Sequence, residues 1–463
     1  MIKILFNIIC LFFLSAQIFA LNPKDNTANN FITLMPDVTY EMTFAKFWID
    51  MMEEPDLVIL TSSQIEAMNK KAFENLIWLD TLRDWDQEIL RYELLEKIDT
   101  AFPDRELYIN DSLITSDYIK NVIKNMNLDN IAESKTVEYG IIVNKTNTKA
   151  FPVNDIITGE QNDIAFNILQ VSALFTGEPV LILHESLDNQ FYFCASKYFY
   201  AWIDKNDIAL CDSKNEWLEA QTFNNFLLVT GNSIKLDENP FYPGLSGLEF
   251  YMGTKLNLVP VSEQPESLHG RIVYGNYVVK IPVRDSGGFL DYAYVPVPVS
   301  KDVSIGYMPY TYRNVFNQLF KMQGDRYGWG GMLNARDCSA LTQELYRCFG
   351  IYLPRNSRWQ SGYTGRRINL PQLSIEEKDK IISEQVPPGA LMQFPGHIMV
   401  YLGFYNGKFY VMSSVDSFFM FEEESNGIQM QTRSVIINTL DIKRRSGLTW
   451  MESLAAIMII DEI

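Results

Sequence analysis

The stretch that decides the fold of the C-terminal half runs from Arg326 to Ser357: RYGWGGMLNARDCSALTQELYRCFGIYLPRNS. Asp337-Cys338-Ser339 precedes a run whose apolar residues recur at helical spacing, and Gly350 ends that run. Asp337 is a suitable N-cap, so we expect Cys338 in the first turn of a buried helix. The positive end of the helix dipole would favour the thiolate there, and the thiolate is the nucleophilic form of cysteine.

A cysteine nucleophile needs an imidazole partner, and the sequence has three histidines. His397 follows Cys338 by 59 residues (397 − 338), in the strand–turn–strand pattern GHIMVYLGFYNGKFYVMSS. Within it, Asn406-Gly407 predicts a tight hairpin. We interpret His184, at the end of an apolar run, as structural, and we assign no role to His269. Cys338 and His397 are therefore the predicted nucleophile and general base.

A third polar group usually orients the imidazole. A two-residue turn at Asn406-Gly407 would pair Ser414 with Met399, on the same face of the sheet as His397. In that register Asp416 would lie directly across from His397 on the neighbouring strand. One bulge would exchange Ser414 for Ser413. The hairpin alone therefore leaves these three residues open.

Composition limits the function. A length of 463 residues favours roughly three domains. The net charge of −18 argues against nucleic acid as a partner and favours a small substrate over an intact anionic wall. Met1–Ala20 predicts a signal peptide, and no other stretch is long and apolar enough to span a bilayer, so we expect an exported protein. The predicted thiol chemistry uses no cofactor and no metal.

Four cysteines follow the predicted signal peptide. An exported chain can form disulfides, and a Cys194–Cys211 bridge is one such option. Cys348 falls on the apolar side of the Cys338 helix, so we interpret it as a small core residue rather than a catalytic one.

The chain changes its pattern twice before the nucleophile. Residues 22–134 are rich in helical spacing, and short β-rich runs follow from about Val137. The clearest of these runs are Tyr139–Val143, Pro179–Leu183, Phe191–Ala195 and Tyr200–Ile203. A second β-rich block includes Tyr277–Val283. From about Ser300, Thr311 is expected to cap a helix whose apolar face contains Val315, Leu319 and Met322.

The ordered set Tyr327-Gly328-Trp329-Gly330-Gly331, Asp337-Cys338-Ser339, Leu353-Pro354-Arg355 and Gly396-His397 resembles the NlpC family of papain-like cell-wall cysteine peptidases. The upstream chain resembles the branch of this family that carries bacterial SH3-like barrels. The resemblance implies an α+β multidomain protein with a signal peptide (1–20), a helical N-terminal region (21–135), two SH3-like β-barrels (136–215 and 216–299) and a papain-like α+β peptidase domain (300–463).

The resemblance also assigns residues to roles. The third catalytic position, usually His, Asn or Gln in the family, falls on Ser413. Tyr327 would belong to the active-site wall, with a core aromatic as the alternative, and Ser339 to the substrate-binding motif. Asp337 would contact the free amine of L-alanine, and Tyr198 of the first barrel would assist.

These assignments imply a peptidase that cuts murein stem peptides between γ-D-glutamate and the diamino acid, in fragments with a free N-terminal L-alanine. Two alternatives remain open. One is a catalytically impaired murein-peptide-binding protein of the same fold, and the other is an acyl or amide transferase that uses the same thiol.

Overall fold

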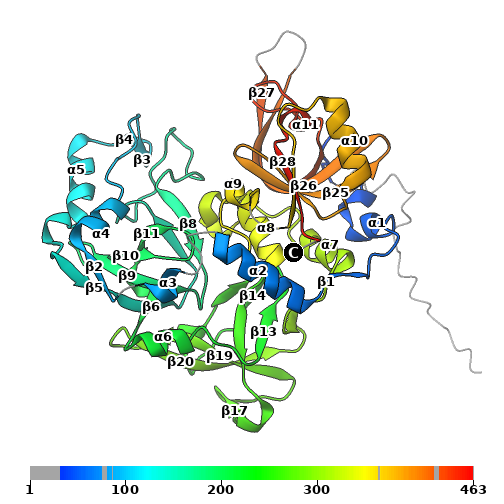
Figure 1. The fold of residues 1–463 in the computed structure, drawn as a ribbon. Coiled ribbons are helices and arrows are strands. Elements are labelled where there is room, and N and C mark those ends of the chain that lie inside the picture. Colours follow the sequence, from blue (N-terminus) through cyan, green and yellow to red (C-terminus); the bar gives the residue numbers. More distant parts are fainter. Residues whose placement is uncertain (1–31, 76–80, 86, 363–364, 422–426, 462–463) are drawn as a thin grey trace, which may run out of the picture.

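The computed structural model describes residues 32–75, 81–85, 87–362, 365–421 and 427–461. The predicted signal peptide lies outside these ranges. A seven-stranded barrel, a second β-rich domain and a mixed C-terminal domain group around helix α8 (Cys338–Arg347), as Figure 1 shows. Throughout the described ranges, every helix is too short or too polar to cross a bilayer.

The first barrel is an antiparallel sheet in the order β12-β6-β9-β10-β11-β7-β8. The four β-rich runs predicted from the sequence are confirmed as β6, β9, β10 and β11. Trp202, from the predicted run Tyr200–Ile203, is fully buried in its core. The strands are β6 (Glu138–Ile142), β7 (Thr146–Lys149), β8 (Gln170–Leu174), β9 (Pro179–Glu185), β10 (Phe191–Ala195), β11 (Tyr200–Asp204) and β12 (Ile208–Cys211).

The second β-rich domain is an antiparallel sheet in the order β20-β19-β16-β13-β21 around its own apolar core. Its assignment as a second SH3-like barrel stays a prediction. Its strands are β13 (Phe226–Val229), β16 (Lys255–Leu258), β19 (Asn276–Arg284), β20 (Leu290–Pro298) and β21 (Val303–Ile305), beside the short pairs β14 (Ser233–Lys235) with β15 (Glu249–Tyr251) and β17 (Ser267–Leu268) with β18 (Arg271–Ile272). The helix α6 (Lys214–Glu219) links it to the first barrel.

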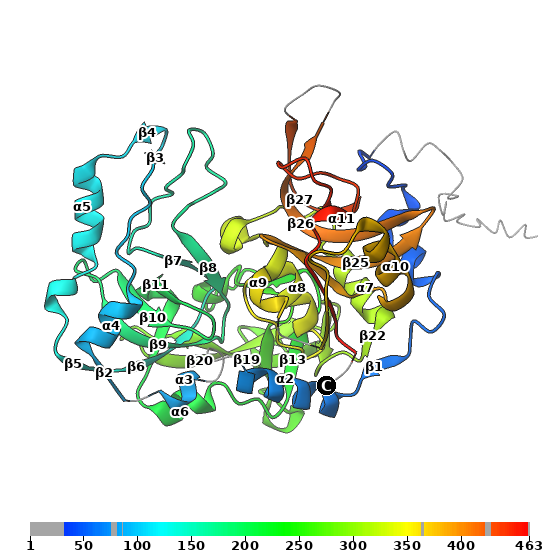
Figure 2. The ribbon, with the colours of Figure 1, turned by 45° about the horizontal axis from the view of Figure 1, so that its top comes forward.

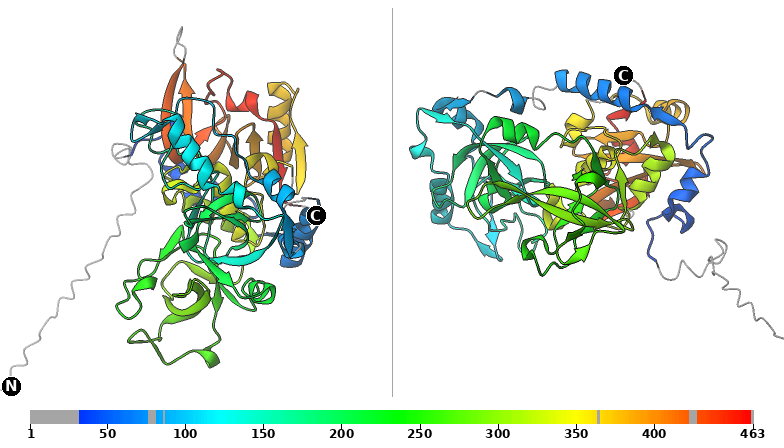
Figure 3. Two further views of the ribbon diagram at one scale, coloured as in Figure 1. Left: turned by 90° about the vertical axis from the view of Figure 1, so that its left-hand side faces the viewer. Right: turned by 90° about the horizontal axis from the view of Figure 1, so that it is seen from below.

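The N-terminal region packs on two domains in turn, as the view from below in Figure 3 shows. Its first part lies on the C-terminal domain, where Trp48 packs against Gly403 and Tyr410 and Asn69 donates to the Gly350 carbonyl at 2.7 Å. Its second part packs on the first barrel through buried Leu94. The elements are α1 (Ala45–Ile49), β1 (Val58–Leu60), α2 (Ser62–Asn75), α3 (Thr81–Asp84), β2 (Glu88–Leu90), α4 (Arg91–Lys97), β3 (Tyr108–Ile109), β4 (Ser112–Leu113), α5 (Ser116–Asn125) and β5 (Ser134–Thr136).

The C-terminal domain has helices before its sheet, the order expected of a papain-like domain. Thr311 caps α7 through its side chain, as predicted, and Leu319 and Met322 are buried. The antiparallel sheet, in the order β23-β28-β24-β25-β26-β27, has α7 and α8 on one face and α10 and α11 on the other (Figure 2). The elements are β22 (Tyr310–Thr311), α7 (Tyr312–Phe320), α8 (Cys338–Arg347), α9 (Ser357–Gln360), β23 (Arg366–Asn369), α10 (Ile375–Gln385), β24 (Leu391–Phe394), β25 (His397–Tyr405), β26 (Lys408–Met420), β27 (Ile428–Thr439), α11 (Trp450–Ser453) and β28 (Ala456–Ile459).

Candidate active site

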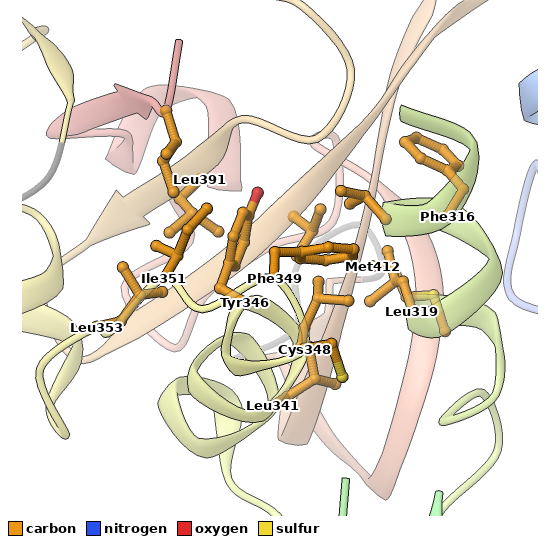
Figure 4. Packing of buried hydrophobic residues seen from close by; sticks show 14 of the residues in the cluster. Phe316, Leu319, Leu341, Tyr346, Cys348, Phe349, Ile351, Leu353, Leu391 and Met412 are labelled. Atoms are coloured by element: carbon orange, nitrogen blue, oxygen red, sulfur yellow. The ribbon is translucent and has the colours of Figure 1, made fainter. Parts of the chain in front are cut away.

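Helix α8 presents Cys338 at its first position, as the sequence predicts. Asp337 is the N-cap, and its carboxylate accepts a hydrogen bond from Ala340 N at 2.9 Å. The apolar side of the helix, including Leu341 and Leu345, is fully buried against α7 and the sheet (Figure 4). A helix fixed along its whole length by the core holds its first residue in a defined place at the surface, where Cys338 is half-buried.

His397 begins β25, directly after Gly396, and its ring packs between two aromatic side chains. The ring centroids of Phe394 and Trp450 lie 5.3 and 4.9 Å from that of His397. The main-chain N–H of the next residue, Ile398, donates toward the Cys338 sulfur. The start of β25 therefore adjoins the start of α8, and both side chains line one cleft.

Ser413 holds the imidazole from the neighbouring strand, because its Oγ lies 2.9 Å from Nε2 of His397. The hairpin turns at Asn406-Gly407 as predicted, and a bulge then shifts the register: Gly403 pairs with Tyr410, whereas Tyr401 pairs with Val411. Leu402 is the extra residue. Of the three open candidates, only Ser413 therefore reaches the imidazole.

The other two candidates have different partners. Ser414 lies on the opposite face and donates to the Arg336 carbonyl at 2.7 Å. Asp416 lies 3.4 Å from the guanidinium of Arg433. Neither side chain is hydrogen-bonded to His397, so the bulge decides which of the three candidates contacts the imidazole.

The environment keeps both central groups neutral in the free protein. Burial and the adjacent Asp337 carboxylate raise the pKa of the Cys338 thiol to about 12. Burial and the positive charge of Arg444 lower the pKa of His397 to about 3. Burial and the Asp337 charge therefore oppose the thiolate that the helix dipole would favour.

Asp337 uses its whole carboxylate within the protein. Oδ1 accepts from Ala340 N, Ser339 Oγ and Arg355 Nη1, and Oδ2 accepts from Gly330 N at 3.1 Å and Arg355 Nη2 at 2.7 Å. Although burial acts in the opposite direction, the charge and hydrogen bonds of Arg355 hold the pKa of Asp337 below its usual value. A carboxylate has about four acceptor positions. The predicted contact with a substrate ammonium group therefore lacks a free acceptor in this arrangement.

Strand β8 of the first barrel forms one wall of the cleft. Gln170 Nε2 donates to the Gly330 carbonyl at 3.0 Å, and Arg355 Nε donates to Ser172 Oγ at 2.7 Å. Gly331 approaches so closely that a Cβ there would lie 2.6 Å from the Cβ of Ala173. The loop therefore needs glycine at position 331, because a barrel strand lies directly against it.

The cleft has a volume of about 440 Å³, and the charged side chains that line it are mostly basic. Its lining contains four basic side chains and two carboxylates, and those carboxylates, Asp337 and Asp416, lie 2.7 and 3.4 Å from arginines. Three of the basic residues are consecutive, Lys443-Arg444-Arg445, on the segment between β27 and α11. Arg444 lies over the Phe394 ring at 4.5 Å. This end of the cleft suits a negatively charged substrate.

Tyr327 and Ser339 also line the cleft, as predicted, but Tyr198 does not. Burial, followed by the charges of Asp337 and Cys338, raises the pKa of Tyr327, which keeps its hydroxyl a donor. Tyr198 lies in the turn between β10 and β11, in a separate cavity with Arg347 at the far end of α8. The structure does not bring Tyr198 to Cys338, because β8 and not this turn lies beside the cleft.

The remaining cysteines and His184 lie outside the cleft. All four described cysteines are free, so the optional Cys194–Cys211 bridge is not formed. Those residues lie on β10 and β12, with two strands between them, and strands about 4.8 Å apart put them beyond disulfide reach. Cys348 is fully buried in the core, as predicted. His184 Nε2 lies 3.1 Å from the Met126 carbonyl, which agrees with a structural role.

Two parts of the site were missed from the sequence. The sequence analysis assigned no role to Arg355 of the Leu353-Pro354-Arg355 motif, although its guanidinium joins Asp337 to the barrel. The basic run Lys443-Arg444-Arg445 is visible in the sequence, but nothing there shows that it reaches Cys338. Among the residues that the structure describes, no cluster of three or more His, Cys, Asp or Glu side chains is arranged to hold a metal ion.

The fold and site define a cysteine-peptidase-type domain joined to an SH3-like barrel. Residues 324–442 match the NlpC/P60 family and residues 157–204 match the SH3 domain of SH3b1 type, so the protein carries an NlpC/P60 domain and an SH3b domain. No curated protein matches the chain.

Solved structures support this fold. An NlpC/P60 endopeptidase from Photobacterium damselae subsp. piscicida is 21% identical, with a TM-score of 0.71 over 93% of this chain and 99% of its own. An NlpC/P60 family protein from Bacillus cereus ATCC 10987 is 16% identical, with a TM-score of 0.44 over 70% of this chain and 99% of its own. The first likeness shows that the overall fold is shared, and the second is too low to add to it.

Proposed function

We propose that the protein is a murein endopeptidase that hydrolyses the bond between γ-D-glutamate and the diamino acid of stem peptides. The observation that carries the proposal is that Cys338 and His397 line one cleft, while the buried Ser413 Oγ lies 2.9 Å from the imidazole. The NlpC/P60 match supports a cell-wall peptidase of the cysteine type. Such enzymes act outside the cytoplasm, in agreement with the predicted signal peptide.

The proposed mechanism starts from the neutral pair. With its proton on Nε2, His397 donates to Ser413 Oγ and leaves Nδ1 to take the thiol proton as sulfur attacks the amide carbonyl. The imidazolium then protonates the departing amine of the diamino acid, which leaves a thioester on Cys338. Water, activated by the same imidazole, hydrolyses the thioester and restores the thiol.

Two donors are available for the negative oxygen of the tetrahedral intermediate. The main-chain N–H of Cys338 is among the first four N–H groups of α8, which have no carbonyl partner within the helix. The Tyr327 hydroxyl stays protonated because burial raises its pKa. Both belong to the cleft that contains the nucleophile.

The basic run supports the choice of substrate. A γ-linked D-glutamate keeps its α-carboxylate, and the diamino acid adds a further carboxylate. Lys443, Arg444 and Arg445 offer cationic donors at the cleft, and a charge-assisted hydrogen bond is about twice as strong as a neutral one. We propose that this run recognises the substrate carboxylates, so that Arg445→Gln raises KM more than it lowers kcat.

Mass spectrometry of L-Ala-γ-D-Glu-diamino acid peptides after incubation with the protein tests the proposal. We expect L-Ala-γ-D-Glu as a product, and none from Cys338→Ala or His397→Ala. Cys211→Ser is the matched control, because Cys211 is a partly exposed cysteine outside the cleft, and it should retain full activity. Intact peptide after prolonged incubation with the wild type would refute the endopeptidase.

The alternative of a murein-peptide-binding protein without activity has less support. It rested on the absence of His, Asn or Gln at the third position. The hydrogen bond between the Ser413 hydroxyl and the imidazole supports the active enzyme instead.

A further inference from the structure

A second cavity, of about 350 Å³, lies where the two β-rich domains meet the last turn of α8. Lys197 comes from the turn between β10 and β11, Lys255 from the start of β16, and Arg347 from the end of α8. None of the residues that line it lines the active-site cleft. Its volume falls within the usual range of small-molecule sites.

The charge of this cavity contrasts with that of the protein. Four basic side chains line it, namely Arg83, Lys197, Lys255 and Arg347, against one carboxylate, Glu178, in a chain of net charge −18. Glu178 does not fully compensate them. One of its oxygens accepts from Phe175 N at 2.9 Å, and the other lies 3.7 Å from Arg347, beyond hydrogen-bond distance.

The lysines and the arginine are held by aromatic rings. Lys197 Nζ lies 5.9 Å from the ring centre of Tyr352, Lys255 Nζ lies 4.9 Å from that of Phe223, and the Arg347 guanidinium lies 5.4 Å from that of Phe175. Rings orient cations but supply no negative charge. Burial lowers the pKa of Lys197, which shows that its charge is costly there without an anion.

Glu344, the other carboxylate of this stretch of α8, is turned away from the cavity. Its Oε2 accepts from Arg336 Nε at 2.6 Å on the side of the helix that faces Asp325. The second pair, Arg336 with Asp325, completes that network at 2.9 Å. Glu178 and Glu344 therefore do not neutralise the positive charge of the cavity.

We infer that this cavity binds a small multivalent anion, whose carboxylate or phosphate oxygens accept hydrogen bonds from the Arg347 guanidinium and the ammonium groups of Lys197 and Lys255. A guanidinium with two flanking ammonium groups matches several anionic oxygens on one ligand. The site is separate from the peptidase cleft, so its occupancy does not depend on Cys338.

Isothermal titration calorimetry of the full chain with citrate and with inorganic phosphate tests the site. We expect saturable binding of at least one anion, with a Kd below about 1 mM. Tighter citrate would identify a carboxylate ligand and tighter phosphate a phosphorylated one. Chloride at equal ionic strength controls for screening.

Variants locate the binding. Lys197→Gln and Lys255→Gln should each raise the Kd by about fivefold or more, because each removes one charged donor. Lys97→Gln is the matched control: Lys97 also stacks on rings, 5.2 Å from that of Tyr200, but does not line the cavity, and its Kd should not change. Cys338→Ala should bind as the wild type does. The inference would be overturned if neither citrate nor phosphate bound, or if the Kd were unchanged in both lysine variants.

Discussion

Ser413 Oγ lies 2.9 Å from Nε2 of His397, although a regular hairpin would turn this serine to the opposite face of the sheet. The bulge at Leu402 makes the difference, since one extra residue in β25 exchanges the two faces of everything beyond it on β26. The proposed orienting group thus depends on a backbone irregularity eleven residues away (413 − 402).

Ser413→Ala should lower kcat about tenfold without abolishing activity, because one hydrogen bond of about 1–1.5 kcal/mol is lost while nucleophile and base remain. Ser414→Ala, next to it on the same strand, should leave kcat unchanged, since its hydroxyl bonds the Arg336 carbonyl. Steady-state kinetics on the stem peptide measure both. Equal kcat values for the two variants would remove Ser413 from the mechanism.

Alkylation of Cys338 should be slow at neutral pH and rise with pH up to at least about pH 10, because the thiol pKa is raised to about 12. A resting thiolate–imidazolium pair would instead give a rate that is already constant from mildly acidic pH. Mass spectrometry of the protein treated with iodoacetamide distinguishes the two profiles. Cys348, fully buried, is the internal control and should stay unlabelled.

Arg355→Met should destabilise the protein by about 3–5 kcal/mol, because it leaves the buried Asp337 carboxylate unpaired. Arg313→Met removes an exposed pair with Asp56 and should cost far less, because solvent screens the pair. Denaturant titration compares the two. Similar losses would mean that the Asp337 pair contributes no more than a surface one.

The same pair predicts a pH dependence. The folded pKa of Asp337 lies below its unfolded value of about 3.9, so the stabilisation is complete above that value and is lost as pH falls toward the folded pKa. Asp337→Asn should therefore flatten the acid side of the stability profile.

Gly331→Ala should destabilise the protein by about 1–3 kcal/mol more than Gly324→Ala does, and should also reduce kcat/KM. Both glycines have a left-handed φ, of 86° and 81°, so the backbone strain of alanine is matched. Only the Cβ at Gly331 would meet the barrel, at 2.6 Å from Ala173, whereas nothing lies within 4 Å at Gly324. Equal stabilities would show that the loop can move away from the barrel without cost.

N-acetylation of the substrate should change kcat/KM by less than about threefold, since Asp337 has no acceptor position left for an ammonium group. Kinetics on the free and acetylated peptides are the comparison. A loss of more than about tenfold on acetylation would restore amine recognition and would mean that a substrate displaces Arg355 or Ser339 from the carboxylate.

Local signals in the sequence were sufficient for much of this structure. The Asp337 cap, the four barrel strands and the Asn406-Gly407 turn depend on neighbouring residues, and all are confirmed. The bulge at Leu402 cannot be predicted from neighbouring residues, because a regular hairpin would satisfy the same alternation of side chains between the turn and Leu402. Ser413 could therefore be selected among three candidates only through the family resemblance.

The sequence was least informative where distant segments meet. Tyr198 belongs to a real barrel turn, but the sequence does not show which edge of the barrel faces Cys338. The thiol pKa and the full use of the Asp337 carboxylate likewise depend on Arg355 and on burial that only the assembled domains create.

The indole of Trp48 rests on Gly403, the residue that follows the bulge, and 5.3 Å separates its ring centre from that of Tyr410, the partner of Gly403 on β26. A segment at the beginning of the chain thus braces the irregular step that sets the geometry of a hairpin near its end. Catalytic competence would then be a property of the whole polypeptide. A peptidase domain cut free of this N-terminal brace would keep every proposed catalytic side chain, and it could still relax to the regular register, with Ser413 facing away from His397.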